Sequence, residues 1–287
     1  MLVDAHHHLW NRARGDYPWM PGAPEILQRD YLVCDLAPLL SRFGIRRTVL
    51  IQAAPTQAET DFLLDIAEKT DFVAGVVGWL DMEDAQFAST LSRYAERPKF
   101  LGLRPMLQDI ADDAWIVRPR VLKALEKLAE QDLTFDFLVL ALHLPHVAET
   151  LRLVPGLRAV IDHLAKPPIA SGDLGFWKDG LARLAEFDTL FCKLSGLITE
   201  ADATAWSVDD LSPAINHALD VFGPQRLIFG SDWPVCRPAG NYADVLAATM
   251  AALPAHLARD PGIFGGNAVR FYGLPAFPAP SDPALSA

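Results

Sequence analysis

The residues best suited to chemistry stand at the start of the chain, where apolar residues lead into His6, His7 and His8. Side chains alternate between the faces of a β-strand, so a strand here directs Asp4, His6 and His8 to one side and His7 to the other. Two imidazoles one pleat apart can bind one cation through neutral ring nitrogens. A polar strand end and an affinity-tag remnant are the alternatives, and the apolar context argues against a tag. We expect a metal site at His6 and His8.

A second polar group follows an apolar run near the other end of the sequence, at Asp232 in the segment FGSDWP. If the chain closes into a barrel, the last strand lies beside the first and Asp232 faces the two histidines. We predict Asp232 as a metal ligand and catalytic carboxylate, with a loop cap as the alternative. His163, which also follows an apolar run, is predicted to face the same centre as a ligand or catalytic group. The alternative is that His163 is a buried histidine whose hydrogen bonds only support the fold.

The composition limits the classes of partner. The chain has 287 residues, 51% of them hydrophobic, and a net charge of -11 from 36 acidic and 25 basic residues without a basic block. Nucleic acids and anionic membranes are therefore excluded as expected partners. We expect a cytoplasmic protein, because no apolar run approaches the roughly 20 residues of a membrane span and no signal peptide is apparent. Three widely spaced cysteines fit reduced thiols better than a disulfide framework.

Strand-like and helix-like runs alternate along the chain, which favours a parallel sheet. After the first strand, which begins at residue 2, strands are predicted at 46–53, 72–81, 100–108, 134–143, 157–165, 189–198 and 226–235. Helices are predicted at 35–43, 56–69, 84–96, 121–131, 147–153, 176–187 and 211–222, with the last ones within 242–274. The predicted fold is a single-domain α/β (β/α)8 TIM barrel over residues 1–274, followed by a proline-rich C-terminal tail at 275–287.

Residues 11–34 form a long segment with no regular pattern, which is typical of a lid or binding loop. We expect this lid loop to fold over the barrel mouth and to bring at least one of Tyr17, Trp19 and Tyr31 near the site. The alternative is a loop whose aromatic side chains pack on the outside of the barrel. Trp19 is predicted to bind substrate.

Chemistry in such barrels is placed at the carboxyl ends of the strands. Four further side chains are predicted to bind substrate from those ends, namely Trp79, Arg104, His143 and Lys166. Arg104 and Lys166 would give positive charge to a developing oxyanion or to a substrate carboxylate. Alternatively, Arg104 forms an ion pair inside the barrel and Lys166 is a solvated side chain, and neither contacts the substrate.

Several segments together resemble the sugar-lactonase branch of the amidohydrolase superfamily, which includes L-rhamnonolactonase-like and L-fuconolactonase-like metal-dependent hydrolases. The segments are DAHHHLW at 4–10, GWLD at 78–81, GLRP at 102–105, DHLAKP at 162–167, CKLSGL at 192–197, FGSDWPV at 229–235 and GNAVRFY at 266–272. The resemblance covers nearly the whole chain. It implies hydrolysis of a small-molecule lactone, of a sugar acid or a related carboxylated compound, with His6, His8 and Asp232 around the reaction centre.

The same resemblance suggests a mechanism. By this resemblance one divalent metal ion, expected to be zinc, would be held by His6 and His8 with His163 and Asp232, and Asp232 would act as general base. Arg104 replaces the bridging lysine or glutamate that would support two metals, and related lactonases without metal leave metal-independent action open. The alternatives are a metal-dependent decarboxylase of an aromatic acid and, from another class, a non-catalytic sugar-binding barrel.

Overall fold

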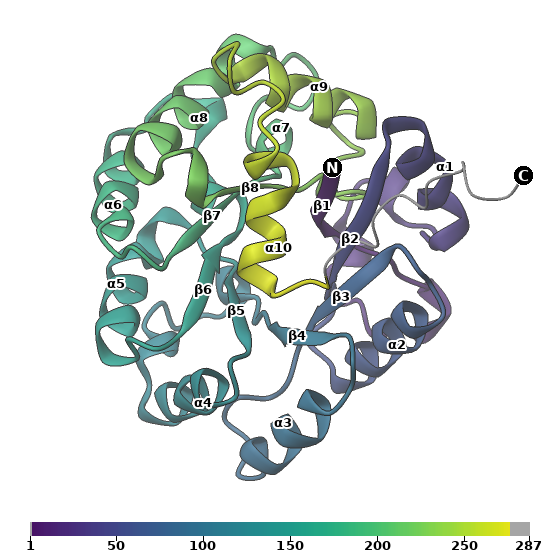
Figure 1. Ribbon diagram of the computed structural model, residues 1–287, viewed down its shortest axis with the longest axis vertical. Coiled ribbons are helices and arrows are strands. Elements are labelled where there is room, and N and C mark those ends of the chain that lie inside the picture. The colour runs from purple at the N-terminus through teal and green to yellow at the C-terminus, as the bar shows by residue number, and fades with distance from the viewer. Residues whose placement is uncertain (1, 276–287) are drawn as a thin grey trace, which may run out of the picture.

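Eight parallel strands lie side by side in the order of the sequence in the computed structural model, which describes residues 2–275 (Figure 1). The strands are β1 (Leu2–His7), β2 (Ile45–Ile51), β3 (Val73–Gly78), β4 (Phe100–Leu103), β5 (Thr134–Phe137), β6 (Arg158–Ile161), β7 (Phe191–Leu194) and β8 (Leu227–Phe229). A parallel bridge between His7 and Trp233 joins the last segment to the first strand. The structure thus confirms a (β/α)8 barrel of one domain.

Helices surround this barrel, as the alternating pattern predicts (Figure 1). They are α1 (Val33–Phe43), α2 (Gln57–Glu68), α3 (Phe87–Ala95), α4 (Pro119–Glu130), α5 (Leu144–Leu153), α6 (Gly175–Ala185), α7 (Leu197–Glu200), α8 (Val208–Phe222), α9 (Tyr242–Ala252) and α10 (Asn267–Tyr272). Local signals explain individual boundaries: Thr56 caps α2 by accepting a hydrogen bond from the N–H of Glu59 over 3.1 Å. None of the helices within residues 2–275 is long and apolar enough to cross a membrane.

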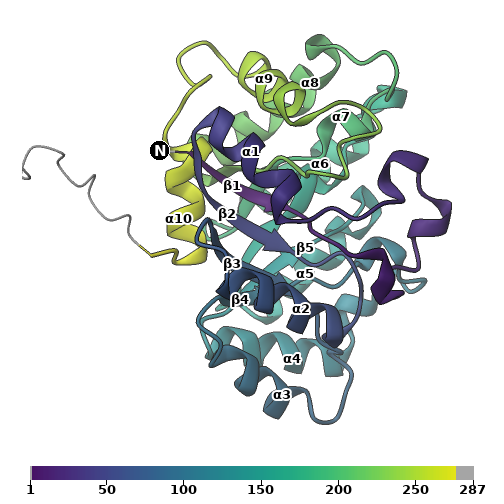
Figure 2. The ribbon, with the colours of Figure 1, turned by 90° about the vertical axis from the view of Figure 1, so that its right-hand side faces the viewer.

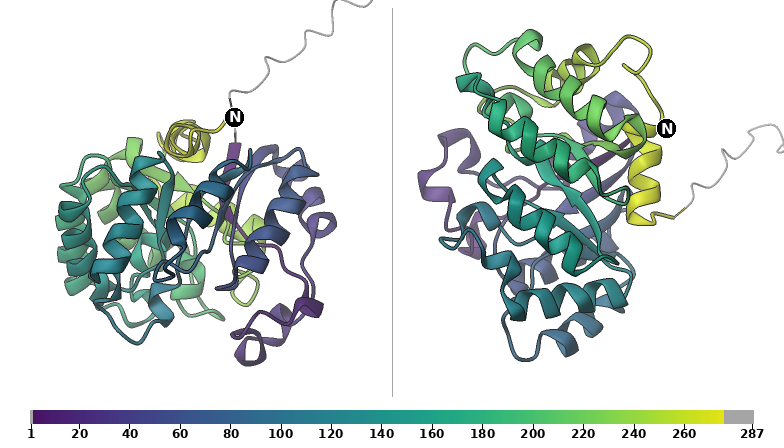
Figure 3. Two further views of the ribbon diagram at one scale, coloured as in Figure 1. Left: turned by 90° about the horizontal axis from the view of Figure 1, so that it is seen from below. Right: turned by 90° about the vertical axis from the view of Figure 1, so that its left-hand side faces the viewer.

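The two ends of the barrel are closed differently. At the amino end of the strands α10 packs on the barrel, and its Phe271 and Tyr272 share a buried cluster with Val3 and Ala5 of β1. The irregular segment after β1 projects at the opposite end (Figures 2 and 3). The carboxyl ends of the strands are therefore the accessible end of the barrel, where the site is to be sought.

Several sequence-based boundaries were wrong for identifiable reasons. The strands are shorter than predicted at their carboxyl ends, because the chain turns into loops there; the run predicted as strand 134–143 ends at Phe137 and continues into a short 3-10 turn at Ala141–His143. The helix predicted at 35–43 begins two residues earlier, at Val33, so Asp35 lies inside its first turn. The carboxylate of Asp35 accepts a hydrogen bond from the N–H of Leu32 over 2.9 Å. Apart from Pro275, the predicted tail lies outside the described residues.

Candidate active site

The first strand places its histidines with the help of an irregularity. The pairing of β1 with β2 shifts register between Asp4 and His7, which changes the alternation of side chains. As a result Asp4 does not join His6 and His8, contrary to the simple strand prediction. Its carboxylate instead accepts hydrogen bonds from the hydroxyls of Ser231 over 2.6 Å and Tyr242 over 2.9 Å. His7 faces away from the other two histidines, as predicted, and contacts Thr48.

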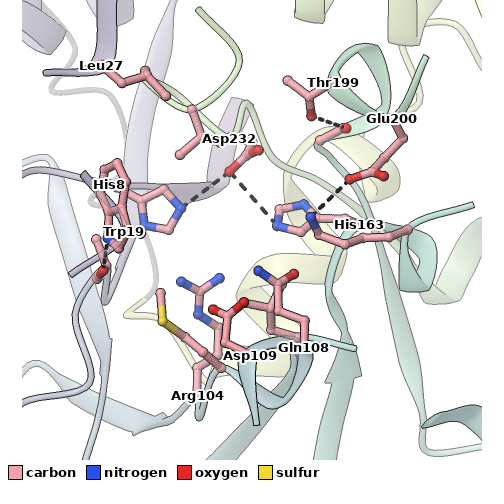
Figure 4. Close-up of a pocket in the computed structure, with 16 residues that line it drawn as sticks. His8, Trp19, Leu27, Arg104, Gln108, Asp109, His163, Thr199, Glu200 and Asp232 are labelled. Carbon is pink, nitrogen blue, oxygen red and sulfur yellow. Dashed lines mark hydrogen bonds and ion pairs between the residues drawn. The ribbon is translucent and has the colours of Figure 1, made fainter. Parts of the chain in front are cut away.

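His6, His8 and Asp232 converge at the carboxyl end of the barrel (Figure 4). The Nε2 atoms of His6 and His8 are 3.2 Å apart, and Asp232 Oδ1 lies 3.3 Å from Nε2 of His8 and 3.7 Å from Nε2 of His6. All three side chains are buried. Two nitrogens bound to one tetrahedral zinc at about 2.0–2.1 Å would be roughly 3.3 Å apart. The spacing of the two imidazoles therefore fits a shared metal ion.

The outer ring nitrogen of His8 supports the same assignment. Nδ1 of His8 lies 2.9 Å from the carbonyl oxygen of Ile51, which can only accept, so Nδ1 carries the proton and Nε2 presents a lone pair towards His6 and Asp232. Nδ1 of His6 lies between a carboxylate oxygen of Asp162 at 3.3 Å and the ammonium group of Lys193 at 3.2 Å. The lone pair of His8 and the carboxylate of Asp232 are two donors directed at one buried point. The residues present thus fit a divalent metal ion.

Electrostatics favour these protonation states. Burial lowers the pKa of His6 well below its ordinary value, against the opposing effect of Asp162, so His6 stays neutral as a ligand must. Burial alone would raise the pKa of Asp232, but His163 and the hydrogen-bonded His8 bring it below the ordinary value for a carboxyl group. Asp232 is therefore ionised and able to bind a cation or accept a proton.

His163 stands in a left-handed turn directly after β6. Four consecutive residues, His163 to Lys166, have φ between 51° and 58°, a conformation that costs roughly 1–2 kcal/mol per residue for L-amino acids. The turn is held by a hydrogen bond from Trp177 Nε1 to the carbonyl oxygen of Leu164 over 2.6 Å. Strain of this kind is concentrated at functional sites. Here it directs both His163 and Lys166 to the cavity at the barrel mouth.

The ring of His163 reaches Asp232 but lies further out than the other two histidines. Its Nε2 is 3.9 Å from Asp232 Oδ1, and its Nδ1 is 2.8 Å from the hydroxyl of Ser195. Burial lowers the pKa of His163 to about 4, so its ring is neutral near neutral pH. His163 also belongs to a second possible ligand group with His6 and Asp162. In that group Asp162 Oδ1 is already occupied by Lys193 Nζ at 2.8 Å.

A fully buried ion network lies beneath the site. Lys193 Nζ contacts Asp162 Oδ1 at 2.8 Å and Asp136 Oδ2 at 2.5 Å, and the latter also accepts a hydrogen bond from Tyr272 of α10. Arg104 adds an ion pair with Asp162 at 3.3 Å and donates a hydrogen bond to the carbonyl oxygen of Gln52. Arg104 is thus engaged inside the barrel while it also lines the cavity.

The cavity above these residues has a volume of about 250 Å³. Among its lining residues are the predicted His8, Trp19, Arg104, His163, Lys166 and Asp232. It also includes Gln108, the polar residue at the end of the run predicted as strand 100–108. The other lining residues were not expected from the sequence, namely Leu27, Ala53, Met106, Asp109, Leu138, Gly196, Thr199, Glu200 and Val235. Several of these follow β4 and β7, so attention to the residues after each strand could have found them. Figure 4 shows Trp19 and Leu27 on one side of the cavity and Glu200 on the other.

Two predicted substrate-binding residues lie away from this cavity. His143 is buried, and its Nδ1 accepts a hydrogen bond from the N–H of Leu140. Trp79 lines a neighbouring groove. Within the irregular segment, Tyr17 and Tyr31 pack around Trp10, whereas Trp19 reaches the cavity and donates a hydrogen bond from Nε1 to the carbonyl oxygen of Ala53 over 2.7 Å.

Comparisons with known proteins identify the family of this chain. The amidohydrolase family model matches residues 3–274. An L-fucono-1,5-lactonase from Burkholderia ambifaria is 44% identical over 277 residues, 95% of either chain. Another L-fucono-1,5-lactonase, from Burkholderia multivorans, is 36% identical over 99% of both chains. A crystal structure of a B. multivorans amidohydrolase with bound zinc has a TM-score of 0.90 and 35% identity, covering 96% of this chain and 100% of that one. The chain belongs to the amidohydrolase family.

Proposed function

We propose that this protein hydrolyses the lactone of a sugar acid to the open-chain hydroxy acid. The observation that carries the proposal is the convergence of His6, His8 and Asp232 on one wall of a cavity whose size suits a single sugar ring. The mixture of aromatic, aliphatic and polar lining residues suits a ring with apolar faces and several hydroxyl groups. The similarity to L-fucono-1,5-lactonases over nearly the full length supports the same reaction class.

We assign His6, His8 and Asp232 as the residues that would hold one zinc ion, with His163 beside them. When bound, such an ion polarises a carbonyl and lowers the pKa of a water ligand from 15.7 to about 7. The donor set of two imidazoles and one carboxylate is typical of catalytic zinc sites, which leave a position open. The zinc-bound relative is consistent with this choice of metal.

The protein's own groups handle the proton. Asp232 accepts a proton from the attacking water as its oxygen bonds to the lactone carbonyl carbon. The bond between that carbon and the ring oxygen then breaks, and Asp232 returns the proton to the departing oxygen. His163, 3.9 Å from Asp232, is placed to hydrogen-bond the reacting oxygens. Arg104 holds Asp162 from below through an ion pair, and Asp162 in turn lies 3.3 Å from Nδ1 of His6.

The other two candidate functions fit the site less well. A non-catalytic sugar-binding barrel needs the histidines and Asp232 separated or blocked, whereas they lie within 3.7 Å of one another. An aromatic-acid decarboxylase would share the histidines and the aspartate. The segments around Lys166 and Lys193, however, resemble lactonases, and the near full-length relatives carry lactonase names.

A cytoplasmic location is also proposed, because Cys34, Cys192 and Cys236 are free thiols.

A pH-indicator assay against a panel of sugar lactones, combined with metal analysis of the purified protein, tests the function. We expect acid release from at least one deoxyhexonolactone or hexonolactone, and about one divalent metal per chain. Release of CO₂ from an aromatic acid, without activity on any lactone, would replace the proposal by the decarboxylase alternative. Tight sugar binding without turnover would favour the binding protein.

A further inference from the structure

Lys166 does not present a free positive charge to the cavity. Its Nζ atom lies 3.0 Å from Oε1 of Glu200, the last residue of α7, and both side chains are only about one-fifth exposed. Both line the cavity, together with the neighbouring Thr199. The pair joins the left-handed turn after β6 to the helix after β7, and the dashed contact of Glu200 is visible in Figure 4. Lys166 therefore lines the cavity as predicted, but its charge is already paired with a carboxylate.

The other charged side chains that line the cavity also offer no free positive charge. Arg104 is paired with Asp162, so each Lys or Arg that lines the cavity has a carboxylate partner. Asp109 also lines the cavity, and within residues 2–275 it has no ion-pair partner. A second carboxylate on the substrate would therefore find no unpaired lysine or arginine among the lining residues and would face Asp109 and Glu200. Hydroxyl groups, in contrast, can donate to these carboxylates and accept from the lysine.

We propose that Glu200 is a specificity-determining residue, which neutralises Lys166 and so selects neutral polyhydroxy lactones against lactones that carry a second carboxylate. This inference rests on the proposed lactonase function and deepens it. Removal of the Glu200 charge would leave Lys166 in place, held by its strained turn, and free to pair with an anionic substituent. The expected consequence is a gain of activity on a carboxylated lactone, which a purely structural ion pair would not produce.

The test compares two lactones that differ only in whether the terminal carbon is a hydroxymethyl group or a carboxylate, L-galactonolactone and galactarolactone. The wild type should prefer the neutral lactone in kcat/KM. Glu200→Gln should shift the ratio towards the carboxylated lactone by about tenfold or more, the range for a charge-assisted hydrogen bond. Adding Lys166→Gln to that variant should abolish the gain. Glu130→Gln, which breaks the exposed Lys127–Glu130 pair on α4, is the matched control and should leave the ratio unchanged.

Two results would overturn the inference: a folded Glu200→Gln protein with an unchanged ratio, or a wild type that prefers the carboxylated lactone. The preference of the wild type can be measured even if the Glu200→Gln variant does not fold. If the wild type hydrolyses no lactone, the proposed function fails first. Calorimetric binding of galactonate and galactarate to wild type and Glu200→Gln then tests the charge selection separately, with tighter galactarate binding to the variant expected and equal binding contradicting it.

Discussion

The backbone N–H of Asp232 donates a hydrogen bond to the carbonyl oxygen of His6 over 2.8 Å. The first strand and the segment after the last strand are thus joined by main chain at the very residues whose side chains meet in the site. This link does not depend on the Asp232 carboxylate. The charge of Asp232 can therefore be removed without removing the contact that positions it.

Asp232→Asn should lower kcat by about 10² to 10⁴, because an amide cannot accept the proton of water as a carboxylate does. With zinc in excess, so that metal loss does not contribute, thermal stability should change little, since Asp232 has φ 53° and asparagine tolerates this left-handed conformation well. Steady-state kinetics with a melting curve checks both parts. Asp179→Asn, at an exposed position of α6, is the control with the same chemical change. Near-normal turnover in a folded Asp232→Asn protein would refute the general base.

Removal of metal should abolish most of the lactonase activity and lower the melting temperature, because a ligand bound only to the folded state stabilises it. Dialysis against a chelator, followed by activity and metal measurements, tests this, and added zinc should restore both properties. His8→Gln should reduce the metal content in the same way, whereas His256→Gln at an exposed site should not. Full activity of metal-free protein would show that the three residues act without an ion.

Trp19→Ala should raise KM several-fold with a smaller effect on kcat. The indole lines the cavity and is fixed by its hydrogen bond to Ala53, so its loss removes apolar contact with the bound ring in both the ground and transition states. Trp206→Ala provides the control. This residue also donates to a backbone carbonyl, that of Ala239, but it does not line the cavity. Equal kinetic effects of the two substitutions would argue against a binding role for Trp19.

Lys193→Met should reduce the free energy of unfolding by about 3–5 kcal/mol, the usual cost of leaving a buried charge without its partner. Asp136 and Asp162 both depend on this ammonium group. Adding Asp136→Asn should recover part of the loss, because one fewer carboxylate then remains uncompensated. Urea unfolding of the two variants measures this difference. A double variant that is less stable than Lys193→Met would contradict the charge argument.

Glu59 gives the protein a pH-dependent stability. Burial raises the pKa of Glu59 from 4.5 to about 8, although the N–H groups of Ala53 and Ala54 donate to its carboxylate. The folded state therefore keeps a proton that the unfolded state has lost. This contribution to stability is complete below the unfolded pKa and is lost as pH rises through the folded one. Glu59→Gln should flatten the fall in unfolding free energy between about pH 5 and pH 8, as urea titrations at both values would show.

The sequence by itself determined the barrel and the centre of its site. Alternating strand and helix patterns predict parallel strands, and closing eight of them forces the first strand next to the last. The proximity of His6, His8 and Asp232 could therefore be predicted, because each stands near the carboxyl end of one of these two neighbouring strands. Local periodicity was sufficient for this step.

Only the tertiary structure decided the remaining parts of the site. The register shift in β1 sends Asp4 to Ser231 and Tyr242, a change that pairing with β2 imposes and strand alternation cannot reveal. Whether Lys166 is free or neutralised depends on Glu200, which is distant in sequence and comes close only when the loops after β6 and β7 pack together. Side-chain partners across the barrel mouth are set by this long-range packing, so the charge of the cavity could not be predicted from the chain alone.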